Sequence, residues 1–112
     1  MNLTSIDNGS VRIVTVEADR IDAAMAIQFK DEMRTETVSG PDHVILNLSQ
    51  VEFIDSSGLG AIVAAMKQLG NSRRLELAGL TPAVDKVFRL TRMDTVFRLF
   101  PTLEDAVASL AD

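Results

Sequence analysis

Residues 53–60 read Phe-Ile-Asp-Ser-Ser-Gly-Leu-Gly, and this stretch says more about the fold than any other part of the chain. An apolar, strand-like pair runs into Asp55, two hydroxyl residues follow, and two glycines then open an apolar segment with helical spacing. Ser56 and Ser57 are therefore predicted to lie at a turn from a strand into a helix. Backbone N–H groups at a helix start lack intrahelical partners and favour negative charge. The turn is thus a place that can carry a phosphate.

Strand and helix signals alternate on both sides of this turn. Short apolar or β-branched runs predict strands, and apolar residues that recur every three or four positions predict helices. The predicted strands cover residues 3–6, 11–16, 44–48, 75–78 and 96–100, besides the strand-like pair at 53–54. The predicted helices follow Asp22, Ser57, Thr81 and Thr102, of which Asp22, Thr81 and Thr102 are expected to cap their helices.

This order of elements, ββαβαβαβα, predicts an α/β fold with a mixed β-sheet of about five strands and four helices. A turn at Asn8-Gly9 predicts an antiparallel hairpin at the start of the chain, which is why a mixed sheet is expected. The run at 44–48 is largely apolar, so it is expected to be a central strand covered on both faces. At 112 residues, with no linker or repeat, the chain is expected to be a single domain, 1–112.

Composition narrows the classes of function. Hydrophobic residues make up 46%, too many for a disordered chain, yet no apolar run reaches the ~20 residues that span a bilayer. The net charge is −5, without a basic stripe or an aromatic platform, so nucleic-acid binding is not expected. With no cysteine and one histidine, we expect neither a metal site nor a cofactor. The absence of cysteine and of a visible secretory signal fits a cytoplasmic chain.

Several of these segments resemble one known family. The stretch at 53–60, with its Asp-Ser-Ser-Gly, is similar to the signature loop of the anti-sigma factor antagonist family, also called STAS domains. The segments 19–22, 44–48 and 80–88 resemble the family's approach to its first helix, its central strand and its third helix. One departure is Asp19, which stands where many members have Gly and adds a charge near the expected docking surface.

The resemblance implies a regulatory switch rather than an enzyme. In that family the first hydroxyl after the Asp is phosphorylated by a partner that is both anti-sigma factor and serine kinase, and Ser56 is that position here. The unphosphorylated chain is then expected to bind a GHKL-type kinase of this sort and to free its client, a sigma factor or another output. Phosphorylation at Ser56 would block binding, and a PP2C-type phosphatase would reset the switch. Such partner switching regulates transcription in bacterial signalling.

Several residues of the loop have more than one interpretation from the sequence. Asp55 either caps the following helix, or orients the serine hydroxyl or helps to hold the kinase's metal–nucleotide. Gly58 and Gly60 each cost up to ~1 kcal/mol relative to Ala inside a helix. They indicate the close approach of another backbone, a fit into the kinase cleft, or a flexible turn. Either serine, Ser57 above all, can also be read as an N-cap.

The helix that follows has an apolar face and a face of small residues. At helical spacing, the residues expected to face the core are Leu59, Ile62, Val63, Met66 and Leu69. The residues expected on the other side are Ala61, Ala64, Ala65 and Gln68. Small side chains there would admit a partner helix, although Ala is also simply a good helix former. The predicted partner-binding residues are Asp22, Asp55, Ser56, Ser57, Gly58, Leu59, Gly60, Ala61, Ala64 and Ala65.

Two other functions are compatible with parts of the sequence. A stand-alone domain of this family can be a subunit of a lipid-transport ATPase and keep the loop without being phosphorylated. A hydrolase of small esters would need a base near Ser56. The one histidine, His43, precedes the central strand, whereas Ser56 follows the loop beyond that strand, and no Gly-x-Ser-x-Gly elbow is present. An enzyme is therefore not expected.

Overall fold

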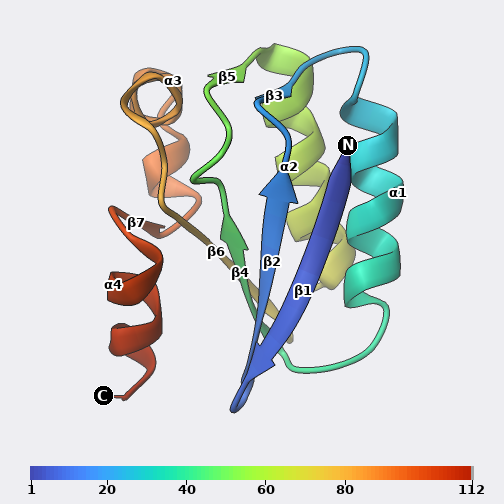
Figure 1. Ribbon diagram of the computed structural model, residues 1–112, viewed down its shortest axis with the longest axis vertical. Coiled ribbons are helices and arrows are strands. Elements are labelled where there is room, and N and C mark those ends of the chain that lie inside the picture. The colour runs from blue at the N-terminus through green and yellow to red at the C-terminus, as the bar shows by residue number, and fades with distance from the viewer. Residues whose placement is uncertain (112) are drawn as a thin grey trace.

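Strand β4 (His43–Asn47) lies at the centre of a five-stranded sheet in the computed structural model, which describes residues 1–111 (Figure 1). The strand order is β1-β2-β4-β6-β7, in which the other strands are β1 (Asn2–Asn8), β2 (Val11–Glu17), β6 (Arg74–Ala78) and β7 (Leu99–Phe100). β1 and β2 form the predicted antiparallel hairpin, and the other neighbouring pairs in this sheet are parallel. The predicted mixed sheet and its central strand are confirmed.

Helices cover both faces of this sheet. The α-helices are α1 (Ala26–Thr37), α2 (Ser56–Leu69), α3 (Pro82–Leu90) and α4 (Leu103–Ala108), with 3-10 turns η1 (Met93–Thr95) and η2 (Ser109–Ala111). α1 and α2 pack against each other on one face, whereas α4 packs on the other (Figure 1). Within residues 1–111 the predicted number of helices, four, is confirmed.

A second, short ladder lies at the upper end of the molecule in Figure 1, beside the start of α2. It consists of β3 (Arg20–Ile21) and β5 (Phe53–Ile54), which pair in parallel. Ile21 and Ile54 are both buried, so the ladder is fastened to the larger core. The strand-like pair at 53–54 is confirmed. β3 was not predicted, because two residues are too few to show a period.

The apolar side chains of β4 point alternately into two cores. Val44 and Leu46 join the larger core with Phe29 of α1. Ile45 joins the smaller core with Ala106 of α4. All five side chains are fully buried. Burial on both faces explains why this strand does not alternate apolar with polar residues.

Helix α1 begins at Ala26 rather than directly after Asp22, so the prediction that Asp22 caps this helix is wrong. The carboxylate of Asp22 accepts from the backbone N–H of Ala24 at 3.1 Å, and its carbonyl accepts from that of Met25 at 3.0 Å. These bonds close a turn that precedes the helix, and Met25 is the N-cap. The short Asp side chain bonds its own backbone two residues on, which is a common way to start such a turn.

The two threonines that precede helices behave differently. Thr102 caps α4 as predicted, because its Oγ1 accepts from the backbone N–H of Asp105 at 3.0 Å. Thr81 stands directly before α3, but its hydroxyl donates to the carbonyl of Val51 at 2.8 Å and does not cap the helix. Thr81 is thus the N-cap residue of α3, as predicted, but the predicted capping bond from its hydroxyl is absent. Its hydroxyl instead ties the start of α3 to the loop that leads into β5.

The last strand, β7, is shorter than the predicted run at 96–100. The backbone N–H of Phe97 donates to the carbonyl of Met93 at 2.8 Å, which extends the η1 turn. Regular strand pairing therefore begins only at Leu99. The Phe97 ring packs edge-on against Phe88 of α3, with ring centroids 6.2 Å apart. The apolar character of this run thus reflects core packing more than strand structure.

Candidate functional site

Ser56 and Ser57 are the first two residues of α2, and both are exposed. β5 leads directly into Asp55, which has extended backbone geometry (φ −107°, ψ −175°) and is the N-cap of the helix. The predicted strand-to-helix turn is confirmed, although the helix begins at Ser56 and neither serine is its cap. The Ser56 hydroxyl therefore lies at a helix start on the surface, where a modifying protein can reach it.

The Asp55 carboxylate is held by backbone amides on both of its oxygens. Oδ1 accepts from the N–H of Gly58 at 2.9 Å, and Oδ2 accepts from the N–H of Ala23 at 3.1 Å. The capping interpretation is therefore confirmed. Because both oxygens are engaged, this geometry favours a structural role over orientation of the Ser56 hydroxyl. A contact with a kinase's metal–nucleotide stays a prediction.

The two glycines in the first turn of α2 differ in whether the fold requires a glycine at their position. A Cβ at Gly58 would lie 2.0 Å from the carbonyl oxygen of Ile21, far inside van der Waals contact. Gly58 is thus required by the close approach of another backbone, as one of the predicted alternatives had it. A Cβ at Gly60 would meet nothing within 4 Å, and Gly60 is exposed. The fold itself does not require a glycine there.

The prediction that Ala61 and Ala65 lie on an exposed face of α2 is wrong. Each side chain is only 3% exposed, because this side of α2 belongs to the core and the helix packs beside α1. The residues predicted to face the core do belong to it, fully or in part: Leu59, Ile62, Val63, Met66 and Leu69. Gly60 and Gln68 are exposed and Ala64 is half-buried. A partner that approaches α2 can therefore touch Gly60 and Ala64, but not the other two alanines.

The β3–β5 ladder presents an aromatic and charged surface next to the loop. Arg20 stands opposite Phe53, and its guanidinium carbon lies 5.6 Å from the centroid of the Phe53 ring. The same guanidinium lies 3.5 Å from the carboxylate of Asp22 and 4.0 Å from that of Asp19. Sequence reasoning singled out the two acids but missed Arg20 and Phe53 as a pair. Only the pairing of β3 with β5 brings them together.

His43 is part of a different cluster. Its Nε2 lies 2.6 Å from Oε1 of Glu76, a carboxylate buried on β6, and Arg98 approaches the other oxygen of Glu76 at 3.9 Å. His43 starts β4, whereas Ser56 follows the chain beyond the far end of that strand. No serine–histidine pair for nucleophilic catalysis is therefore assembled within residues 1–111. Glu76 was missed because it alternates with leucines, a pattern that predicts exposure.

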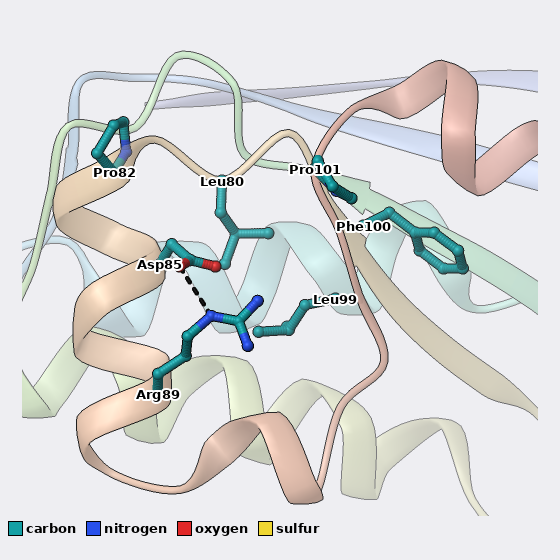
Figure 2. A pocket seen from close by; sticks show the side chains of 7 residues that line it. All are labelled: Leu80, Pro82, Asp85, Arg89, Leu99, Phe100 and Pro101. Carbon is teal, nitrogen blue, oxygen red and sulfur yellow. Dashed lines mark hydrogen bonds and ion pairs between the residues drawn. The ribbon is translucent and has the colours of Figure 1, made fainter.

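Two hollows lie away from the serine loop. Figure 2 shows the larger one, about 370 Å³, between α3 and β7, lined by Leu80, Pro82, Asp85, Arg89, Leu99, Phe100 and Pro101. An ion pair between Asp85 Oδ2 and Arg89 Nε, 2.8 Å long, lies at its edge. The second hollow, about 310 Å³, lies where β4 and β6 end beside the start of α4. Neither is lined by a residue of 53–60, whose two serines are exposed on the surface.

The described part of the chain lacks two other features that would indicate a function. No cluster of three or more His, Cys, Asp or Glu side chains there has the geometry to hold a metal ion. No helix there is both long enough and apolar enough to cross a bilayer.

The fold and the loop together define a class of protein: a small α/β domain in which an exposed serine follows an N-capping aspartate at the start of a helix. The family model described as the STAS domain matches residues 3–106, which is most of the chain. The chain therefore belongs to the STAS domain family, and the resemblance seen in the sequence is confirmed.

Several relatives of the chain are named as anti-sigma factor antagonists. The anti-sigma-F factor antagonist RsfB of Mycobacterium tuberculosis is 26% identical over 110 residues, which cover 98% of this chain and 89% of RsfB. The anti-sigma-B factor antagonist of Listeria monocytogenes is 29% identical over 83 residues, 73% of each chain. The crystal structure of an anti-sigma factor antagonist from Mycobacterium paratuberculosis has a TM-score of 0.87 and 29% identity, covering 99% of this chain and 94% of that one.

Proposed function

We propose that this chain is an anti-sigma factor antagonist that acts by partner switching. Its unphosphorylated form binds, in the cytoplasm, a GHKL-type protein that is both anti-sigma factor and serine kinase, and thereby releases the client. The observation that carries the proposal is the exposed hydroxyl of Ser56 at the first position of α2, in a member of the STAS family. The names of the relatives support it.

In this proposal the chain is a substrate and a ligand, not an enzyme. The Oγ of Ser56 attacks the γ-phosphorus of ATP held by the kinase. A new Ser56 Oγ–P bond forms, the bond between the γ-phosphorus and ADP breaks, and the hydroxyl proton passes to a base or to solvent. A PP2C-type phosphatase hydrolyses the phosphoserine and restores the hydroxyl. The exposure of Ser56 supports both steps, since each enzyme must reach the same atom.

Phosphorylation acts on docking more than on folding. A phosphate adds roughly −1.5 to −2 charges, which the start of α2 favours by about 0.3–1 kcal/mol and the Asp55 carboxylate opposes. On an exposed residue these opposing effects are both small, so the fold is little changed. At an interface the same charge must be desolvated or paired, and an unpaired one costs several kcal/mol. Because about 1.4 kcal/mol is a tenfold change in affinity, phosphorylation weakens binding by about a hundredfold or more.

Two experiments with the anti-sigma factor kinases encoded in the source genome test the proposal. In the first, wild type, Ser56→Ala and Ser56→Asp are compared as baits; wild type and Ser56→Ala retain a kinase, and Ser56→Asp loses it. In the second, wild type and Ser56→Ala are incubated with that kinase and ATP, and intact mass is measured. Wild type gains one phosphate and Ser56→Ala gains none. Ser57→Ala, which removes the neighbouring hydroxyl, is incubated in the same way as the matched control and still gains one phosphate.

The experiments also separate this function from its rival. A subunit of a lipid-transport ATPase would bind its partner equally well in all three forms and take up no phosphate. Equal recovery of one partner by wild type, Ser56→Ala and Ser56→Asp would therefore count against the switch. The intact Asp-Ser-Ser-Gly at 55–58 and its exposed hydroxyls are the observations that favour the switch.

A further inference from the structure

Phe53 is a large aromatic side chain that stays exposed next to the serines of the loop. The large apolar side chains that stay exposed in the described part of the chain are Ile6, Ile27, Val38, Phe53, Leu90 and Val96. Phe53 is the aromatic one among them and the one that belongs to the 53–60 loop. It is 48% exposed, three positions before Ser56. An aromatic ring left in water beside a modifiable hydroxyl is typical of an anchor for a protein partner, because such rings supply large contact area.

The ring is held in place by its surroundings before any partner arrives. The carbonyl of Asp19 accepts from the backbone N–H groups of Glu52 at 2.8 Å and of Phe53 at 3.2 Å. The guanidinium of Arg20 lies over the ring at 5.6 Å, within the range of a cation–π interaction. Arg20 is itself fixed beside Asp22 at 3.5 Å. A side chain that is already ordered loses little entropy on binding.

This surface and the serine form one rigid unit. β5 continues without a linker from Phe53 into Asp55 and the start of α2. Asp55 in turn is bonded to the backbone N–H of Ala23, in the segment that follows β3. Figure 1 shows β3, β5 and the first turn of α2 at the same end of the molecule. A protein that docks over Ser56 therefore meets the β3–β5 ladder in a fixed position.

We infer that Asp19, Arg20 and Phe53, here called the ladder patch, select which anti-sigma factor kinase docks on the Ser56 loop. The inference rests on the proposed function and adds the residues that decide partner choice. The partner it fits presents an apolar depression for the Phe53 ring. Beside that depression lie a carboxylate that faces Arg20 and a basic group that faces Asp19. The side chains of Asp19 and Arg20 are 75% and 52% exposed, so a partner can reach both charges although Arg20 already lies near Asp19 and Asp22.

The test measures the affinity of each purified anti-sigma factor kinase from the source genome for wild type and three variants by calorimetry. Phe53→Ala weakens the best kinase at least tenfold, and Arg20→Glu and Asp19→Asn change the order of preference among the kinases. Val38→Ala and Arg34→Glu are the matched controls, since both residues are exposed at the opposite end of α1 from the Ser56 loop. The controls stay within twofold of wild type. Thermal unfolding checks that each variant is folded. Because Arg20→Glu keeps the Phe53 ring, it tests the charge of the patch separately from the aromatic contact.

The outcomes separate this inference from the function on which it rests. If Phe53→Ala and Arg20→Glu keep the affinity and the order of wild type while Ser56→Asp abolishes binding, the ladder patch plays no part and the switch stands. If wild type binds none of the kinases, the proposed function fails, and the inference fails with it. If the variants weaken every kinase equally, the patch is a general anchor, and the inference that it selects the partner is overturned.

Discussion

The backbone N–H of Ala23 donates to Oδ2 of Asp55 at 3.1 Å, across 32 residues of sequence. The other oxygen of the same carboxylate caps α2 through the N–H of Gly58. One side chain thus fastens the turn before α1 to the start of α2, the helix whose first residue is Ser56. The loop is therefore ordered in the free protein, and a partner that binds it does not have to order it first.

Replacement of Asp55 by Ala is expected to lower the free energy of unfolding by about 1–2 kcal/mol, because the N-cap of α2 is lost together with the bond to Ala23. Asp55→Asn costs less, since its one carbonyl oxygen still accepts one of the two amides. Urea unfolding at neutral pH measures the free energy of unfolding of both variants. Asp31→Ala, an exposed acid on α1, is the control and stays within about 0.5 kcal/mol of wild type. An Asp55→Ala protein as stable as wild type would contradict the double role of this carboxylate.

The two glycines of α2 are expected to respond in opposite ways to the same substitution. Gly58→Ala places a methyl group against the carbonyl oxygen of Ile21, 2.0 Å away, and destabilises the protein by about 1–3 kcal/mol. Gly60→Ala meets nothing within 4 Å and stabilises it by about 0.5–1 kcal/mol, because Ala is the better helix former. Thermal unfolding of the two variants side by side measures the difference. Equal effects of the two substitutions would show that the approach of Ile21 does not constrain the loop.

The sequence predicts the elements and the loop well, but the burial of particular helix residues poorly. The strand-to-helix turn at 55–58 carries local signals, an acid, two hydroxyls and a glycine, so it could be placed without the fold. Ala61 and Ala65 carry no such signal, because Ala suits a core and a surface equally. Their burial is decided by how closely α2 packs beside α1, which is a tertiary property.

Pairing between distant segments is the other feature that the sequence does not contain. Arg20 and Phe53 become neighbours only because β3 and β5 form a ladder of two residues each, too short for any periodic pattern. Glu76 alternates with leucines, and that pattern predicts a solvent-facing side chain. It is buried and lies beside His43 of the neighbouring strand, on the sheet face that α4 covers in part. The missed residues are those whose surroundings come from far along the chain.

A pH-dependent contribution to stability is expected from the first hairpin. Arg12 donates two hydrogen bonds to the Asp7 carboxylate, at 2.7 and 2.9 Å, and these lower the pKa of Asp7 below its usual 3.8. A lowered folded-state pKa stabilises the protein fully above pH 3.8, and this stabilisation is lost as the pH falls through the lowered value. The gap in melting temperature between wild type and Asp7→Asn should thus be constant between about pH 5 and 7 and shrink in stronger acid.

The control for this prediction removes the partner of Asp7. In an Arg12→Gln background, Asp7→Asn should produce no gap that changes with pH, because the hydrogen bonds that shift the pKa of Asp7 are gone. Arg12 also donates to the carbonyls of Glu36 and Ser39 at the end of α1, so its loss lowers the melting temperature at every pH. A gap that persists unchanged in acid, in the wild-type background, would show that the ionisation of Asp7 is not the source of the stabilisation.

The charge that blocks docking is expected to leave the fold almost unchanged. Ser56→Asp places a carboxylate on the first residue of α2, where the helix start attracts it and Asp55 repels it. Because the residue is exposed, the free energy of unfolding changes by less than about 1 kcal/mol. Affinity for the kinase partner nevertheless falls by about a hundredfold, since the charge must be desolvated in the interface. Asn71→Asp, which adds the same charge at the far end of α2, is the control; it leaves the affinity unchanged and lowers the free energy of unfolding by at most about 1 kcal/mol, because that end of the helix repels negative charge. If Ser56→Asp unfolded the protein, loss of binding would follow from loss of structure, and the switch would be one of folding rather than of docking.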